Sequence, residues 1–196
     1  MASKGPDQGR LIAVEGTRGA DLAPAAERLL RHYGKGGRGG GISQWDASGA
    51  FFDLLLGKHK ILTPSPRTLL LLYAYDLVFR LRWQIRPALE EGKCVIAAPY
   101  VESAMAFGVS VGLPKSWLDY VFSFAPKPYA CYRTKEKKKK KPPGKGKPSD
   151  GYLEFCFTAL RASSAGWDPA ELRGRSIAYL DEMERSGGCR KVTKHL

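Results

Sequence analysis

The fold is decided by the stretch Arg10-Leu11-Ile12-Ala13-Val14-Glu15-Gly16-Thr17-Arg18-Gly19-Ala20-Asp21-Leu22-Ala23. Its first six residues are a largely apolar run that predicts a strand, and Gly16 ends that run. Apolar residues then recur at helical spacing up to Tyr33, which predicts a helix. A strand, a glycine-containing loop and a helix in this order are typical of an α/β domain.

Strands and helices also alternate in the rest of the chain. The continuous apolar run over 94–98 predicts a parallel strand that is covered on both faces. A long helix is predicted over 67–91, with Pro87 kinking its end, and the part from Leu69 to Phe79 is apolar on nearly every side. The remaining predictions are helices over 50–56, 103–108, 114–120, 152–162 and 169–185, and strands over 121–124 and 129–132. Together these elements predict one α/β domain over residues 1–196 with a largely parallel sheet.

Charge is unevenly distributed along the sequence. The 196 residues include 32 Lys+Arg and 19 Asp+Glu, which gives a formal net charge of +13. The segment from Lys135 to Lys147 contains eight lysines and one glutamate and therefore carries +7 of that total. Its prolines and glycines indicate a solvated loop, and we place a lysine-rich insertion at 133–150. Six glycines within residues 34–41 indicate a second surface connection.

Composition excludes several classes of protein. Hydrophobic residues make up 43% of the chain, which is enough to bury a core, so the chain is not disordered as a whole. The first ten residues lack the apolar region of a signal peptide, and no apolar run is long enough to cross a membrane. The four cysteines form no CxxC pair and the three histidines lie apart, so neither a metal site nor a redox pair is expected. We therefore expect a cytoplasmic protein with reduced cysteines and no membrane insertion.

The loop after the first predicted strand lies where a phosphate-binding loop would lie. A working P-loop ends in Gly-Lys-Ser/Thr, because the glycine admits the phosphates, the lysine neutralises them and the hydroxyl holds Mg²⁺. Here the three positions hold Asp21, Leu22 and Ala23. On these residues alone, the loop is a tight turn between a strand and a helix, in which Gly16 and Gly19 provide the backbone shape.

Three segments further along the chain resemble the thymidylate kinase family. They are Leu70-Leu71-Leu72-Tyr73-Ala74-Tyr75-Asp76, Ile85-Arg86-Pro87-Ala88-Leu89-Glu90-Glu91-Gly92-Lys93-Cys94-Val95-Ile96 and Tyr100-Val101-Glu102-Ser103-Ala104-Met105-Ala106-Phe107. The corresponding family segments read roughly LLF-x-A-D-R, I-R-P-A-L-x-x-G-x-V-V and D-R-Y-x-x-S-x-x-A-Y. The resemblance covers residues 11–31 and 69–107. It implies a three-layer α/β domain of the P-loop NTPase type, with a central parallel sheet flanked by helices.

This resemblance implies a nucleotide site and a dimer. Members of the family transfer phosphate from ATP–Mg²⁺ to dTMP and are typically homodimers. Tyr73 replaces the aromatic residue that stacks on thymine, and Asp76 either faces the active site or has a buried structural role. The implied nucleotide-binding residues are Glu15, Gly16, Gly19, Tyr73, Asp76, Tyr100, Ser103, Ala104 and Phe107. The implied homodimer or heterodimer forms through the helix from Leu69 to Phe79.

The departures from the family concern the charged groups of the kinase reaction. Leu22 and Ala23 replace the lysine and the hydroxyl residue of the P-loop, Leu77 replaces an arginine, and Ala98-Pro99 replace an Asp-Arg pair. Phosphoryl transfer depends on positive charge and Mg²⁺ positioned around the phosphates. The sequence therefore predicts a catalytically defective relative, a pseudokinase that acts by binding a dTMP-like nucleotide or a protein partner.

Two other functions stay open at this level. The first is an active nucleoside monophosphate kinase that uses ATP and Mg²⁺ and rebuilds its phosphate site with Arg18, Arg80 and the lysine-rich segment. On a simpler interpretation, Arg80 belongs with Arg82 and Arg86 to a solvated stripe of the long helix. The second is a basic interaction protein that binds nucleic acid or an acidic partner through its lysines.

Overall fold

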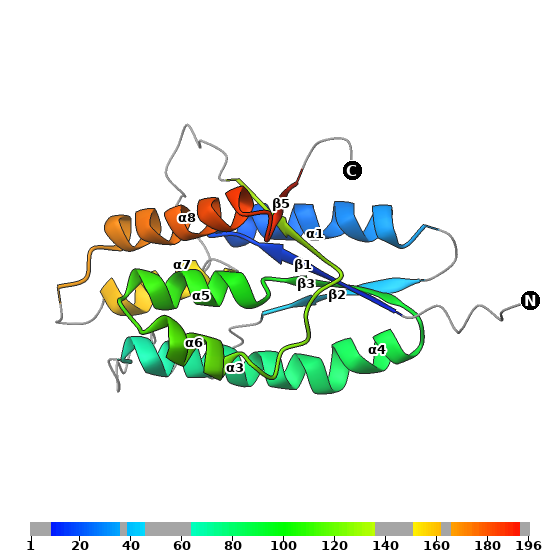
Figure 1. The fold of residues 1–196 in the computed structure, drawn as a ribbon, viewed down its shortest axis with the longest axis horizontal. Coiled ribbons are helices and arrows are strands. Elements are labelled where there is room, and N and C mark those ends of the chain that lie inside the picture. The colour runs from blue at the N-terminus through cyan, green and yellow to red at the C-terminus, as the bar shows by residue number, and fades with distance from the viewer. Residues whose placement is uncertain (1–8, 36–38, 46–63, 136–150, 162–165, 193–196) are drawn as a thin grey trace, which may run out of the picture.

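The computed structural model describes residues 9–35, 39–45, 64–135, 151–161 and 166–192. These residues form an α/β domain in which helices flank a central five-stranded parallel sheet of order β2-β3-β1-β4-β5 (Figure 1). In chain order the elements are β1 (Arg10–Glu15), α1 (Gly19–Tyr33), β2 (Gly40–Gln44), α3 (Pro66–Arg80), η1 (Leu81–Ile85), α4 (Arg86–Glu90), β3 (Cys94–Ala98), α5 (Val101–Ser110), α6 (Lys115–Val121), β4 (Ala130–Arg133), α7 (Tyr152–Arg161), α8 (Pro169–Arg185) and β5 (Arg190–Lys191).

The central strand β1 divides the core into two clusters. Ile12 and Val14 are fully buried against α1, in the cluster that contains Leu22 and Leu29. Leu11 and Ala13 point to the opposite face, where α3, α5, α7 and α8 contribute a larger cluster rich in aromatic side chains. β1 and β3 are thus covered on both faces, as their apolar runs predict.

The long predicted helix is confirmed over residues 66–90, with a change of winding near its end. The Ser65 hydroxyl caps α3 by accepting a hydrogen bond from the Thr68 amide at 3.1 Å. The helix then passes through the π-helical turn η1 into α4, whose second residue is Pro87. The irregularity expected at Pro87 therefore takes the form of a wider turn just before the proline.

Two sequence predictions of local structure are wrong. Residues 40 and 41, expected to lie in a glycine-rich connection, belong to the edge strand β2, which pairs with β3. A Cβ on Gly40 would lie 2.3 Å from the Cys94 carbonyl oxygen, so this pairing needs a glycine. Residues 121–124, predicted as a strand, end α6 and form a turn, because Phe122 packs into the core from the helix end. The predicted helix over 50–56 and most of the lysine-rich insertion lie outside the described residues.

The cysteines also differ from expectation. Cys131 on β4 and Cys189 just before β5 form a disulfide, whereas Cys94 and Cys156 are buried cysteines outside this bond. The two bonded cysteines are 58 residues apart in sequence and become neighbours because β5 pairs with β4. Their spacing in the sequence carries no sign of this pairing, which depends on the tertiary fold.

Candidate functional site

In the loop between β1 and α1, the amides of Gly16 and Gly19 donate to side chains of the protein itself. The Gly16 amide donates to the Ser103 hydroxyl at 3.1 Å, and the Gly19 amide donates to Glu154 Oε2 at 3.1 Å. Arg18 Nε lies 3.8 Å from Asp21 Oδ2 and 3.9 Å from Glu154 Oε1. A helix N-terminus favours an anion, and at α1 the Glu154 carboxylate occupies that place, with Asp21 in the first turn of the helix.

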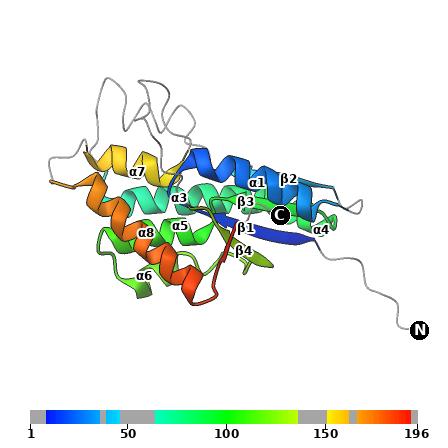
Figure 2. The same ribbon diagram turned by 90° about the horizontal axis from the view of Figure 1, so that it is seen from above.

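Helix α7 holds Glu154 in this position by packing its first turn onto the loop. Figure 2 shows α7 next to the beginning of α1. A Cβ on Gly151 would lie 2.6 Å from the Gly19 nitrogen, so the two backbones touch. On another side of the loop, a Cβ on Gly16 would lie 2.1 Å from Thr134 Oγ1. The loop is therefore enclosed by α7 and by the segment that follows β4.

The residues that the resemblance assigns to the nucleoside pocket lie in the aromatic core. Tyr73, Ser103, Ala104 and Phe107 are fully buried. The centroid of the Tyr73 ring lies 4.3 Å from that of Tyr152, the first residue of α7, and the Phe107 centroid lies 5.9 Å from it. The Tyr73 ring, which the resemblance assigns to stacking on thymine, thus packs against the Tyr152 ring.

Arg80 is buried, so the expectation that it belongs to a solvated stripe is wrong, although Arg82 and Arg86 are exposed. Its Nε donates to Asp76 Oδ2 at 2.7 Å, its Nη1 donates to the Pro99 carbonyl at 3.2 Å and the Ser43 carbonyl at 3.5 Å, and its Nη2 donates to the Tyr73 hydroxyl at 3.3 Å. The guanidinium therefore ties α3 to the ends of β2 and β3. Asp76 takes part in this structural network.

Glu15, at the end of β1, is fully buried and caps the N-terminus of α5. Its carboxylate accepts the Ser103 hydroxyl at 2.6 Å and the amides of Ser103 at 2.9 Å, Glu102 at 3.0 Å and Tyr100 at 3.3 Å. Burial raises the pKa of Glu15 to about 7; the hydrogen bond from Ser103 opposes this, and the nearby charge of Glu102 adds to it. Hydrogen bonds thus connect Glu15 with Tyr100 and Ser103 with Gly16.

The raised pKa of Glu15 predicts a pH dependence of stability. The folded protein holds this proton more tightly than the unfolded chain, so the stabilisation is present at low pH and is lost as the pH rises through 7. We expect Glu15 alone to make the protein about 2 kcal/mol more stable at pH 5.5 than at pH 7.5. Urea unfolding of wild type and Glu15→Gln at both pH values measures this, with the exposed Glu171→Gln as control. A difference between the two pH values that is equal in wild type and Glu15→Gln would contradict the assignment.

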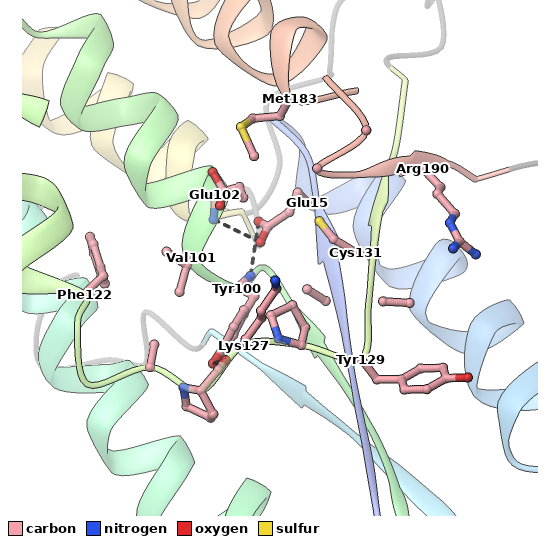
Figure 3. Close-up of a pocket in the computed structure, with 17 residues that line it drawn as sticks. Glu15, Tyr100, Val101, Glu102, Phe122, Lys127, Tyr129, Cys131, Met183 and Arg190 are labelled. Carbon is pink, nitrogen blue, oxygen red and sulfur yellow. Dashed lines mark hydrogen bonds between the residues drawn. The ribbon is translucent and has the colours of Figure 1, made fainter. Parts of the chain in front are cut away.

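A cavity of about 440 Å³ lies beside Glu15 (Figure 3). It is bounded by β1, the start of α5, the segment 122–131 and the turn between α8 and β5. Charged side chains in its lining are Glu15, Glu102, Lys127 and Arg190. Sequence reasoning missed this cavity because its walls come from four distant segments.

The cations at the start of the lysine-rich insertion are paired with α8. Arg133 is 4% exposed and forms ion pairs with Asp181 and, at 3.4 Å, with Glu184. Lys135 Nζ lies 3.5 Å from Glu184 Oε1. Of the insertion, only residues 133–135 are described.

Neither a cluster of metal ligands nor a membrane-spanning helix occurs among the described residues. In that part of the chain, no group of three or more His, Cys, Asp and Glu side chains is arranged to hold a metal ion. None of the helices described is both long and apolar enough to cross a bilayer.

Comparison with known proteins points to one family, although no family model matches the chain. A probable thymidylate kinase from Pyrobaculum calidifontis is 32% identical over 127 residues, which are 60% of this chain and 60% of that protein. Probable thymidylate kinase 2 from Saccharolobus solfataricus is 31% identical over 62% of this chain and 56% of that protein. The chain thus matches well under two thirds of the length of these relatives.

Solved structures of thymidylate kinases share the fold. The enzyme from Ehrlichia chaffeensis superimposes with a TM-score of 0.60 at 16% identity, covering 94% of this chain and 85% of that one. The enzyme from Candida albicans gives 0.59 at 21% identity, covering 94% and 83%. The resemblance to the thymidylate kinase family and the P-loop α/β fold predicted from the sequence are therefore confirmed.

Proposed function

We propose that this chain, a relative of thymidylate kinases with their fold, does not transfer phosphate and acts by binding a nucleotide or a protein partner. The observation that carries the proposal is the Glu154 carboxylate on the Gly19 amide, at the N-terminus of α1. In the same loop, Leu22 and Ala23 stand at the positions of the P-loop lysine and hydroxyl residue. The loop thus lacks the positive charge of the P-loop lysine, and the Glu154 carboxylate lies at the start of the helix.

Electrostatics at the loop disfavour a triphosphate. Glu154 and Asp21 supply two negative charges, and Arg18 lies within 4 Å of both. A phosphate oxygen about 4 Å from either carboxylate would be repelled by roughly 4 kcal/mol near a protein surface. ATP would have to displace Glu154 and separate α7 from the loop. The residues present therefore do not fit an ATP–Mg²⁺ complex, and we derive no catalytic step through one.

At the monophosphate side, the positions at which the resemblance implies arginines hold no cation. Leu77 and the Ala98-Pro99 pair stand where the resemblance implies arginines. Arg80, the candidate replacement, is buried and bonded to Asp76, Tyr73 and two carbonyl groups. An active kinase would therefore depend on Arg18 and on the lysines of 133–150. This favours a pseudokinase over an active kinase with a rebuilt phosphate site.

The experiment that tests the proposal is a coupled assay of phosphotransfer from ATP–Mg²⁺ to dTMP with purified protein. Wild type and Glu154→Gln are compared, because the variant removes the charge from α1 and keeps the shape of the side chain. The proposal expects no activity above background for either protein.

An exposed apolar face on the long helix supports a protein partner. Leu71, Tyr75, Val78, Phe79 and Trp83 are each 47–64% exposed, and their spacing places them along one side of α3 and η1. Contiguous exposed apolar side chains of this kind mark interaction surfaces. We propose that the chain forms a homodimer through this face, as the resemblance implies.

Self-association through this face predicts a concentration-dependent mass. We expect wild type to have the mass of a dimer in light scattering after gel filtration, and Phe79→Glu with Trp83→Glu to have that of a monomer. Tyr129→Glu is the matched control, since Tyr129 is exposed to the same 64% as Trp83 and lies elsewhere. A monomeric wild type, or a double variant that stays dimeric, would overturn this proposal.

A further inference from the structure

The cavity beside Glu15 has the size and walls of a small-molecule site. Its volume of about 440 Å³ lies within the range of roughly 300–1,000 Å³ that ligand pockets have. Gly16, Gly19 and Tyr73 do not line it, whereas Glu15 and Tyr100, which the resemblance assigns to the nucleotide site, do. The lining thus overlaps only in part with the nucleotide site that the resemblance implies.

The inner wall of the cavity contains two carboxylates, one from β1 and one from α5. Glu15 accepts hydrogen bonds from three amides and one hydroxyl, all uncharged donors. Glu102 Oε2 accepts from the Tyr179 hydroxyl at 2.8 Å, and Glu102 Oε1 has no hydrogen-bond donor within the described part of the chain. No lysine or arginine of the described residues forms an ion pair with either carboxylate.

Two neighbouring, desolvated acids that have no ion-pair partner of their own attract a cation. The charge of Lys115 lowers the pKa of Glu102, but Lys115 is itself paired with Asp119 at 2.9 Å. Burial raises the pKa of Glu102 as well as that of Glu15, because water is excluded from both. An ammonium group bound here would offset the mutual repulsion of the acids and donate to the open Glu102 oxygen. The aromatic and apolar surfaces that complete the lining favour an organic cation.

The remaining walls suit the apolar body of such a ligand. Tyr100 and Phe122 contribute rings, Pro126 and Pro128 contribute flat apolar surfaces, and Met183 covers the side formed by α8 (Figure 3). Aromatic rings can bind both a cation and an apolar group. The wall formed by residues 187–190 is joined to β4 through the disulfide between Cys131 and Cys189, which gives the cavity a fixed boundary.

We propose that this cavity binds a small organic amine, with its ammonium group against Glu15 and Glu102 and its aromatic or aliphatic body between the rings and prolines. This site is independent of phosphotransfer, because it shares only Glu15 and Tyr100 with the residues that the resemblance implies for the nucleotide. Lys127 and Arg190 also line the cavity, and their charges would disfavour ligands that present a second positive charge.

The test is calorimetry and thermal stabilisation with three probes that share one ring: tyramine, which has only the amine, tyrosine, which adds a carboxylate, and 3-(4-hydroxyphenyl)propionate, which has only the carboxylate. We expect tyramine to bind and the propionate to bind at least 10-fold more weakly. Glu102→Gln should lower the affinity for tyramine at least 10-fold. Glu171→Gln, on the exposed side of α8, should leave affinity unchanged.

A second variant keeps the test valid if Glu102→Gln alters the fold. Met183→Trp is expected to reduce the volume of the cavity without changing its charge, and it should also abolish tyramine binding. The proposal is overturned if none of the probes binds at 10 mM, if the propionate binds as well as tyramine, or if tyramine binds both variants as tightly as wild type.

Discussion

Replacing Arg80 with methionine is expected to lower the free energy of unfolding by about 3–5 kcal/mol, as removing one partner of a buried ion pair does. The substitution keeps most of the side-chain length and removes the guanidinium. Asp76, the Tyr73 hydroxyl and the carbonyl groups of Ser43 and Pro99 would then lose their donors inside the core. Urea unfolding followed by circular dichroism measures the loss.

The control for this prediction is Arg82→Met on the same helix. Arg82 is exposed, and surface substitutions of this kind change stability by about 0.5 kcal/mol or less. A loss below about 1 kcal/mol for Arg80→Met, or equal losses for both variants, would show that the Arg80 network does not hold α3 against the sheet.

Loss of the disulfide is expected to have an effect of similar size. The bond between Cys131 and Cys189 closes a loop of 58 residues, and in the chain-entropy description such a cross-link stabilises the folded state by about 4 kcal/mol. We expect Cys131→Ser with Cys189→Ser to lose roughly that amount relative to oxidised wild type. Unfolding in urea with and without dithiothreitol provides the measurement.

The same experiment contains its own control. Dithiothreitol should destabilise wild type to the level of the double variant and leave the double variant unchanged. Wild type that is equally stable with and without dithiothreitol would show that the bond does not form or does not constrain the unfolded chain.

Sequence patterns found the parts of the fold that depend on local periodicity. The apolar runs of β1 and β3 and the predicted helix over 169–185 agree with the structure, because burial and helical spacing are visible in a short window of sequence. The sequence does not predict β2, because its glycines have low strand propensity. Backbone hydrogen bonds to β3 hold these residues in a strand instead. β5 has two residues and depends on β4 and the disulfide.

The candidate site was predicted less completely, for a similar reason. The sequence located the loop and its missing lysine, but the carboxylate on Gly19 comes from Glu154, which is 135 residues away. Burial of Arg80 had a local sign: Leu69, Tyr73, Leu77 and Arg80 follow helical spacing on one face, and the first three are apolar and buried. Continuing that face through Arg80 would have placed it in the core.

We propose that the fold of a nucleotide kinase persists here without phosphotransfer, because a protein carboxylate stands at the loop where the family would bind phosphates. The most direct measurement is the rate of ADP formation from ATP–Mg²⁺ with saturating dTMP, for wild type and Glu154→Gln. We predict that neither protein exceeds the rate measured without protein, since removing one carboxylate does not supply the missing lysine, hydroxyl and arginines. A dTMP-dependent turnover of about one per second, within the usual range of enzymes, would contradict the claim.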